Sequence, residues 1–341
     1  MKWLMLLLAF AVAVLLTGWL RRYALRQSLL DIPNDRSSHV RPTPRGGGLS
    51  ITLVVLVAVL LLAVYGKLPV MLLLALLPAG VLIGMTGWLD DHFHLAITWR
   101  AASYLLAASW FAWISGGLPE LSLGPGTWTT GILNLPLAVL ALAWLTNLYN
   151  FMDGADALSG LQAVLAGTAG AVLFWLQGAD SLASLAAVTA AAAAGFLVWN
   201  RPPARIFMGD VGSCFLGFIF GCLAILGEKI AQLPALLWLL LLGFFIWDAT
   251  CTLLMRILRR ETWYIAHRCH AYQRLLQLGW SHGRVALAFL IYNLLILWPL
   301  TFWAYFQPRY LLASVLTGMV ISILSWGIVQ LLYLRHKEAV A

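Results

Sequence analysis

The sequence predicts an all-α integral membrane protein that crosses the bilayer many times. Two observations support this prediction: the composition and the long apolar runs. Hydrophobic residues make up 62% of the 341 residues and charged residues only 10%, whereas soluble domains carry about 25% charged residues. The apolar residues gather into runs of roughly 17–25 residues, the length that a helix needs to cross a bilayer. No room is left for a large soluble domain, so we expect residues 1–341 to form a single membrane domain.

Eleven apolar runs predict eleven transmembrane helices. The first run has no small-residue cleavage site before Arg21-Arg22, which favours a retained span over a signal peptide. The run at 213–227 is short, and the run at 182–199 is rich in alanine, which permits close helix packing in lipid. The predicted spans are 3–20, 48–65, 69–89, 97–115, 131–150, 158–177, 182–199, 213–227, 234–257, 285–306 and 311–334.

The distribution of positive charge predicts the orientation. With eleven spans, one side carries the C-terminus and 17 of the 21 Lys and Arg residues, and the other side carries four. Because loops rich in Lys and Arg stay in the cytoplasm, we expect a cytoplasmic C-terminus and an N-terminus on the outside. The same distribution accounts for the net charge of +8, so no nucleic-acid partner is expected. The predicted cytoplasmic loops lie near 21–47, 90–96, 151–157, 200–212 and 258–284.

Six polar stretches fall in or beside the apolar runs, mostly at their predicted cytoplasmic ends. Ionisable groups at membrane depth are costly, so these are candidates for function. Carboxylates that converge beside cationic loops indicate a metal-dependent site for a phosphorylated substrate. The four cysteines form no CxxC pair, so neither a disulfide framework nor a zinc site is expected. The stretches are Asp31–Asp35, Asp90-Asp91, Asn147 to Asp156, Asp210, Asp248 and His267 to His270.

Asp90 and Asp91 end a predicted span. Adjacent acids can point in different directions, one toward a metal and the other toward a substrate. The alternative is a polar helix end that only terminates the span, but a basic end would be the cheaper choice on the cytoplasmic side. Arg100, at the start of the next span, either meets an anionic lipid headgroup or extends to the interface.

Asn147, Asn150, Asp153 and Asp156 follow one another at intervals of three residues. This spacing drifts around an α-helix, so the four side chains cannot form one narrow stripe. Gly154 is expected to end the helix near Asp153, and Asp156 then begins the next helix, where a carboxylate suits the N-terminus. The alternative is that both acids only cap helices, but two asparagines in the same turn favour a site.

Asp210 lies in a tight turn between Gly209 and Gly212. A carboxylate held between glycines is accessible to a metal because little side-chain bulk surrounds it. Asp248 lies inside the ninth predicted span. We expect it either to form a buried interhelical hydrogen bond or to take a direct part in the site, and the sequence favours neither.

Two basic loops complete the candidate site. The segment His267-Arg268-Cys269-His270 lies among further arginines, which favours a nucleotide or pyrophosphate clamp over zinc, since zinc would need further ligands. A solvated, positively charged loop is the alternative. Arg45 precedes three glycines, whose N–H groups either bind a phosphate or only form a flexible entry to the next helix.

Five motifs together resemble the polyprenyl-phosphate N-acetylhexosamine-1-phosphate transferases. They occur in the family's order over most of the chain, and the set is highly specific. The chain is most similar to the branch of glycosyltransferase family 4 that initiates bacterial O-antigen synthesis, with the peptidoglycan precursor translocase as a more distant relative. The motifs are DIPNDRSSHVRPTPRGGG at 31–48, GWLDD at 87–91, NLYNFMDGADALSG at 147–160, FMGDVGS at 207–213 and HRCHAYQRL at 267–275.

The signature acids of that family match Asp90, Asp91, Asp153, Asp156 and Asp210. Its histidine-rich loop, which often carries three histidines, matches His267 and His270, with Arg268 and Cys269 between them. We favour His270 for the family's main histidine because Ala271-Tyr272 follow it in register.

The resemblance implies transfer of an N-acetylhexosamine 1-phosphate from a UDP-sugar to undecaprenyl phosphate, with release of UMP, to initiate O-antigen or related cell-surface glycan synthesis. It implies a bacterial inner membrane, a periplasmic N-terminus and an active site facing the cytoplasm. Mg²⁺, or Mn²⁺ in its place, would be bound by Asp210 and by Asp91 or Asp90. Asp90 would deprotonate or orient the lipid phosphate, while Asp153 and Asp156 would hold the site and the donor.

The remaining predicted site residues would bind substrate, and His267 and His270 with nearby arginines would grip the diphosphate. The expected partners are undecaprenyl phosphate, a UDP-N-acetylhexosamine and membrane lipids. The sugar (GlcNAc, FucNAc or QuiNAc), a one-step or aspartyl-phosphate path, and the oligomeric state, with a homodimer as one option, stay open. The substrate-binding residues are Asn147, Asn150, Arg100, Arg45, Asp248, His267, Arg268 and His270.

The main alternative from another class is a cation-coupled transporter of an anionic solute, with the acids as relay groups. A transporter would place these groups near the bilayer midplane, whereas here they cluster at one face and only Asp248 lies deeper. Within the enzyme class, a hexose-transferring glycosyltransferase would release UDP instead of UMP.

Overall fold

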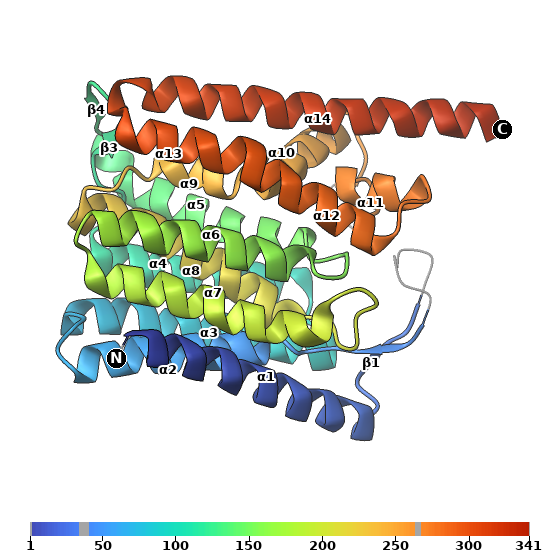
Figure 1. Ribbon diagram of the computed structural model, residues 1–341, viewed down its shortest axis with the longest axis horizontal. Helices are drawn as coiled ribbons and strands as arrows, with labels where there is room; N and C mark the ends of the chain where they lie inside the picture. The colour runs from blue at the N-terminus through green and yellow to red at the C-terminus, as the bar shows by residue number, and fades with distance from the viewer. Residues whose placement is uncertain (1, 34–40, 263–266, 341) are drawn as a thin grey trace.

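The computed structural model describes residues 2–33, 41–262 and 267–340, which form one bundle of helices that run back and forth along a common direction (Figure 1). All eleven predicted ranges are helical. The helices are α1 Lys2–Arg26, α2 Leu49–Val64, α3 Val70–Phe93, α4 Ile97–Ser115, α5 Asn134–Phe151, α6 Leu158–Leu176, α7 Asp180–Asn200, α8 Asp210–Ala231, α9 Leu236–Leu241, α10 Gly243–Leu258, α11 Ala271–Gln277, α12 His282–Tyr292, α13 Trp298–Phe306 and α14 Leu311–Val340.

The predicted polytopic α-helical architecture is confirmed. In the described part of the chain, eight helical segments are long and apolar enough to cross a membrane, and α2 is a shorter apolar helix. Two predicted boundaries were wrong. The span predicted at 234–257 is two helices, α9 and α10, which break at Leu242 before Gly243, a residue with poor helix propensity. The span predicted as short at 213–227 is 22 residues long, because helix α8 begins at Asp210 and ends at Ala231.

Helix α8 lies at the centre of the bundle, and it is the most buried of the eight candidate spans. Its glycines explain why the neighbouring helices approach so closely. A Cβ on Gly217 would lie 2.4 Å from the carbonyl oxygen of Leu145 in α5, and a Cβ on Gly212 would lie 2.6 Å from the Cα of Gly48. Because only glycine avoids these overlaps, the start of α8 is fixed against α2 and α5.

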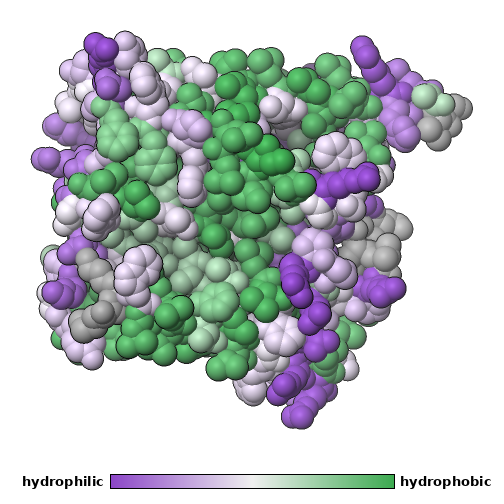
Figure 2. Space-filling model, in the orientation of Figure 1, coloured by the Kyte–Doolittle hydropathy of each residue, from purple (hydrophilic) through white to green (hydrophobic). Residues whose placement is uncertain are grey.

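The two ends of the bundle carry different features. One end holds the C-terminus, helix α11 and an antiparallel pair of short strands, β1 Leu30–Asp31 and β2 Thr43–Pro44. The other end holds the N-terminus and the pair β3 Leu121–Ser122 and β4 Thr127–Trp128 (Figure 1). Hydrophobic side chains cover the middle of the visible face, and hydrophilic ones gather toward both ends (Figure 2). Asp31 lies in β1, whereas Asp35 is outside the described residues.

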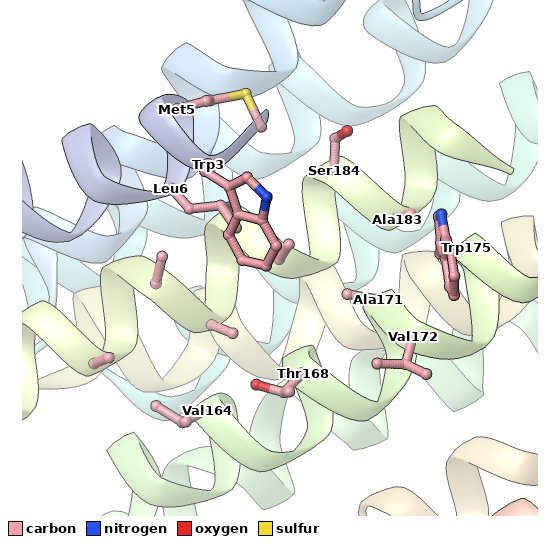
Figure 3. A pocket seen from close by; sticks show the side chains of 14 residues that line it. Trp3, Met5, Leu6, Val164, Thr168, Ala171, Val172, Trp175, Ala183 and Ser184 are labelled. Carbon is pink, nitrogen blue, oxygen red and sulfur yellow. The ribbon is translucent and has the colours of Figure 1, made fainter. Parts of the chain in front are cut away.

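An apolar cavity of about 690 Å³ opens between α1, α6 and α7 (Figure 3). Trp3 and Leu6 line one side of it, and Val172, Trp175 and Ser184 line the others. None of the described residues that line it has an ionisable side chain. This cavity is therefore separate from the candidate acidic residues of the sequence.

Candidate active site

The N-terminus of the central helix α8 is held by a carboxylate from α3. Asp91 accepts hydrogen bonds from the N–H groups of Asp210 (2.9 Å) and Val211 (3.2 Å). The first N–H groups of a helix have no partner within it, so Asp91 stabilises this end. Gly209 has φ 75°, and a Cβ there would lie 2.4 Å from the Asp91 carboxylate. The Gly-Asp turn thus requires its glycine.

Two arginines connect three carboxylates around this helix end. Arg45 donates through Nε to Asp91 (2.6 Å) and through Nη2 to Asp210 (3.0 Å). Arg100 lies 2.8 Å from an oxygen of Asp90 and 3.5 Å from an oxygen of Asp210. Asp210 is therefore the shared centre, and we call these five residues the acidic cluster. The structure brings these five predicted site residues together.

The neighbouring carboxylates keep Arg45 positively charged in this cluster. Burial works against its charged form, but the carboxylates of Asp91 and Asp210 raise the pKa of Arg45 above its ordinary value. Charged hydrogen bonds between a guanidinium and a carboxylate are stronger than neutral ones, so Arg45 ties the β2–α2 segment firmly to α3 and α8.

Of the two predicted asparagines, the structure places one in contact with the acidic cluster. Asn150 donates to Asp210 (3.1 Å) and accepts a hydrogen bond from the hydroxyl of Ser213 (2.7 Å). Ser213 is a residue that the sequence reasoning missed, although it follows Asp210 by one helical turn. Asn147 is half-buried in α5, and its role in substrate binding stays a prediction.

The glycine segment after Arg45 does not offer its N–H groups to a phosphate. The N–H of Gly47 donates to the carbonyl of Phe207 (2.9 Å), and that of Gly48 donates to the carbonyl of Met208 (2.8 Å). The phosphate-binding interpretation is therefore wrong for these two residues. The segment instead docks the turn that precedes Asp210 against the start of α2.

Asp153 lies in the turn after α5, near the acidic cluster. Its burial raises the pKa of Asp153 well above the ordinary range, and the hydrogen bond with Ser159 works in the opposite direction. The negative charges of Asp210 and Asp91 raise the pKa further. Burial of Asp153 therefore favours its protonated form more than in an exposed aspartate, and a protonated carboxyl group can donate a hydrogen bond.

Asp156 joins two other parts of the fold. Its carboxylate accepts a hydrogen bond from the N–H of Ala204 (3.0 Å) and lies 3.3 Å from Nδ1 of His282. Its own N–H donates to the same nitrogen (3.0 Å). These contacts anchor the loop before α8 and the start of α12, so the geometry favours positioning, and the predicted catalytic role stays a prediction.

Asp248 forms the interhelical hydrogen bonds that the sequence left as one of two alternatives. Its buried carboxylate accepts from the N–H groups of Ala271 (2.9 Å) and Tyr272 (3.4 Å) at the start of α11, and from the hydroxyl of Thr252 (3.1 Å). Nδ1 of His270 lies 3.4 Å away. Asp248 thus fixes helix α11 and the histidine that precedes it, and the geometry gives no contact between Asp248 and the acidic cluster.

The basic loop before α11 forms a second group of side chains at the same end of the bundle. The rings of His267 and His270 lie 4.9 Å apart between centroids. Among the described residues, Nε of Arg256, Nδ1 of His267 and Nε of Arg274 are nitrogen atoms of this region that are buried without a hydrogen-bond partner. Unsatisfied buried donors are costly, so this region suits an anionic ligand.

We call His267, His270, Arg256, Arg268 and Arg274 the basic cluster. Arg268 is half-buried, and its carbonyl accepts a hydrogen bond from the side chain of Gln277 (2.8 Å). The hydroxyl of Tyr272 donates to the carbonyl of Phe151 (3.0 Å). This bond links α11 to the end of α5, next to Asp153, so the two clusters are joined through the fold.

His267 predicts a pH dependence of stability. Its burial, together with the neighbouring His270 and Arg256, lowers the pKa of His267 from 6.5 to about 3. The unfolded chain therefore binds a proton in this window that the folded chain does not, and stability falls as the pH falls from 6.5 toward 3. We expect the Tm of the wild type to fall more steeply over this window than that of His267→Gln. Parallel thermal-denaturation curves would contradict the burial of this ring.

Comparison with known proteins gives consistent results. The model of Glycosyl transferase family 4 matches residues 73–228. The chain is 30% identical to decaprenyl-phosphate N-acetylglucosaminephosphotransferase of Mycolicibacterium smegmatis, over 89% of this chain and 82% of the relative. It is 28% identical to the probable undecaprenyl-phosphate N-acetylglucosaminyl 1-phosphate transferase of Bacillus subtilis, over 81% and 79%. It is also 28% identical to phospho-N-acetylmuramoyl-pentapeptide-transferase of Shouchella clausii, over 83% and 91%.

Proposed function

The chain belongs to glycosyl transferase family 4, and on that premise we propose that it transfers an N-acetylhexosamine 1-phosphate from a UDP-sugar to undecaprenyl phosphate. The activities of the relatives support phosphoglycosyl transfer to a polyprenyl phosphate. The observation that carries the proposal here is Asp210, whose carboxylate meets two arginines and an asparagine at the end of a membrane-buried helix. Such a site suits phosphoryl transfer, which depends on positioning and charge neutralisation.

The residues present fit a magnesium ion, which we propose as the cofactor. Among the described residues, no three His, Cys, Asp or Glu side chains form a ready-made metal cage. Mg²⁺ commonly uses one or two carboxylates and completes its shell with substrate phosphates and water. Asp210 and Asp90 suit this role best, since oxygens of both already lie near one cationic nitrogen of Arg100. The bound ion would neutralise charge on the donor diphosphate.

Asp91 suits the metal less well than the sequence prediction assumed. One of its oxygens accepts from Arg45 and from the N–H of Asp210, and the other accepts from the N–H of Val211. We therefore propose Asp91 as the residue that positions Asp210, and Asp90 as the group that orients or deprotonates the lipid phosphate.

In the proposed reaction, an oxygen of undecaprenyl phosphate attacks the phosphorus that bears the sugar, and the phosphoanhydride bond to the uridine phosphate breaks. UMP leaves, and the lipid product keeps both phosphates. Arg45 and Arg100 can turn from carboxylates to phosphate oxygens because each already serves two partners. The Nε groups of Arg256 and Arg274, which have no hydrogen-bond partner among the described residues, would bind the diphosphate.

Product analysis tests the reaction class. Purified protein supplied with undecaprenyl phosphate and a UDP-N-acetylhexosamine should release UMP and form a lipid diphosphate sugar. Because one phosphoanhydride replaces another, added UMP should regenerate the UDP-sugar from the lipid product. Release of UDP, or no lipid-linked sugar with any N-acetylhexosamine donor, would show that the assigned chemistry is wrong.

We also propose that the site faces the cytoplasm of a bacterial inner membrane, where nucleotide sugars are made, and that the product initiates O-antigen or a related surface glycan. The excess of Lys and Arg at the end of the bundle with the acidic and basic clusters supports this orientation. A reporter fused after Ala341 should be cytoplasmic, and one inserted in the 116–130 loop, where β3 and β4 lie, should be periplasmic. Both reporters on one side would contradict the orientation.

A further inference from the structure

The last helix, α14, contacts α10 and the segment that carries the basic cluster through three side chains. Trp326 donates through Nε1 to the hydroxyl of Thr252 (3.0 Å). Gln330 donates to the carbonyl of Cys269 (2.8 Å), and the ring of Tyr333 lies under the guanidinium of Arg274, 3.7 Å from its centre. Spacings of four and three residues place all three side chains on one face of α14.

Arg274 is held on several sides. Besides the ring of Tyr333, its Nη1 donates to Gln277 (2.9 Å) and its Nη2 to the sulfur of Cys269 (3.4 Å). Its Nε is buried without a hydrogen-bond partner in the described structure. A guanidinium that is already fixed loses little conformational freedom when it binds a phosphate.

We propose that Tyr333 and Gln330 are positioning residues for the nucleotide-sugar donor, and that they act by presenting Arg274 as a preformed contact for its diphosphate. The identity of this ligand rests on the proposed function. Tyr333 fixes the plane of the guanidinium, and Gln330 fixes the backbone between the two histidines of the basic cluster. Helix α14 carries none of the motifs that indicate the family, so the assignment comes from these contacts alone.

The size of the expected effect follows from the ring contact. Without the ring, the guanidinium of Arg274 must be ordered when the ligand binds, and ordering one flexible side chain lowers affinity by a factor of about 2 to 12. Tyr333→Leu should therefore weaken binding of UDP by about that factor, whereas Tyr333→Phe keeps the ring and should bind UDP as the wild type does.

The test is the Kd of UDP for the purified full-length protein, measured without turnover, together with steady-state kinetics. Tyr333→Leu should raise the KM for the UDP-sugar and leave the KM for undecaprenyl phosphate unchanged. Tyr310→Leu is the matched control, because Arg309 lies over the ring of Tyr310 at 4.6 Å in the same kind of contact at the other end of α14. This control should bind UDP normally.

Arg274→Lys gives a second measurement that does not require a change in α14. It keeps the positive charge but loses the planar group, so it should weaken UDP binding, and adding Tyr333→Leu should weaken it little more. Additive losses, a wild-type Kd for Tyr333→Leu, or a Tyr333→Phe variant as weak as Tyr333→Leu would each overturn the inference. Failure of the proposed function is distinct, because the wild type would then form no UMP whatever the behaviour of Tyr333.

Discussion

Replacing Asp210 by asparagine is expected to lower kcat by roughly 10³-fold, while the protein still folds and inserts. Asp210 is the carboxylate on which both arginines and Asn150 converge, and we propose that it binds Mg²⁺. An amide keeps the shape of the side chain but loses the charge, so the arginines and the metal lose their common partner. Removal of one group that stabilises charge in a transition state typically costs 10²- to 10³-fold, and loss of a metal ligand adds to this.

The rate of UMP release in a Mg²⁺ titration measures this effect. Glu120→Gln is the control, because it makes the same chemical change at an exposed position beside β3 at the far end of the bundle, and it should keep the wild-type rate. Wild-type protein treated with EDTA should lose turnover and regain it with Mg²⁺. Full activity in EDTA, or a wild-type kcat for Asp210→Asn, would refute the proposed metal role.

The sequence was sufficient to predict the helical membrane bundle and the convergence of the acidic cluster. Apolar runs of bilayer length define spans regardless of what they pack against, and costly carboxylates at one end of several spans identify a site. Arg45 and Arg100 were named for their places beside three glycines and at the start of a span. Each was predicted to bind substrate, and each contacts carboxylates in this structure.

The sequence could not predict which acids accept hydrogen bonds from the backbone of another helix or loop. Asp248 caps α11, a helix 23 residues further along the chain, and Asp156 anchors the loop at Ala204. Such partners depend on which unpaired N–H groups the tertiary fold brings opposite a carboxylate. The contribution of α14 was missed for a related reason. Gln330 and Tyr333 contact Cys269 and Arg274, which lie about 60 residues earlier in the chain, and only the tertiary fold brings them together.

Asp90→Asn and Asp91→Asn are both expected to lose turnover, but for different reasons, although the two residues are adjacent. The side chain of Asp91 is only 2% exposed, and it accepts from Arg45 and from two N–H groups of α8. Its amide variant removes one of the two carboxylates that Arg45 contacts, leaving Asp210, and weakens the acceptor of the two α8 N–H groups. It should lower the free energy of unfolding by about 3 kcal/mol, because buried donors lose a charged partner. Turnover is lost with it because Asp210 is no longer held in place.

Asp90 pairs with Arg100, which is 30% exposed, and accepts from the N–H of Leu95 through its other oxygen. An asparagine keeps an oxygen for that N–H, so the Tm should remain close to that of the wild type. Turnover should nevertheless fall below detection both for UMP release and for the reverse reaction, because one carboxylate serves both directions. Thermal unfolding and both rates, measured on the same purified samples, separate the two roles. A stable but inactive Asp91→Asn together with an unstable Asp90→Asn would reverse the assignment of positioning to Asp91 and of chemistry to Asp90.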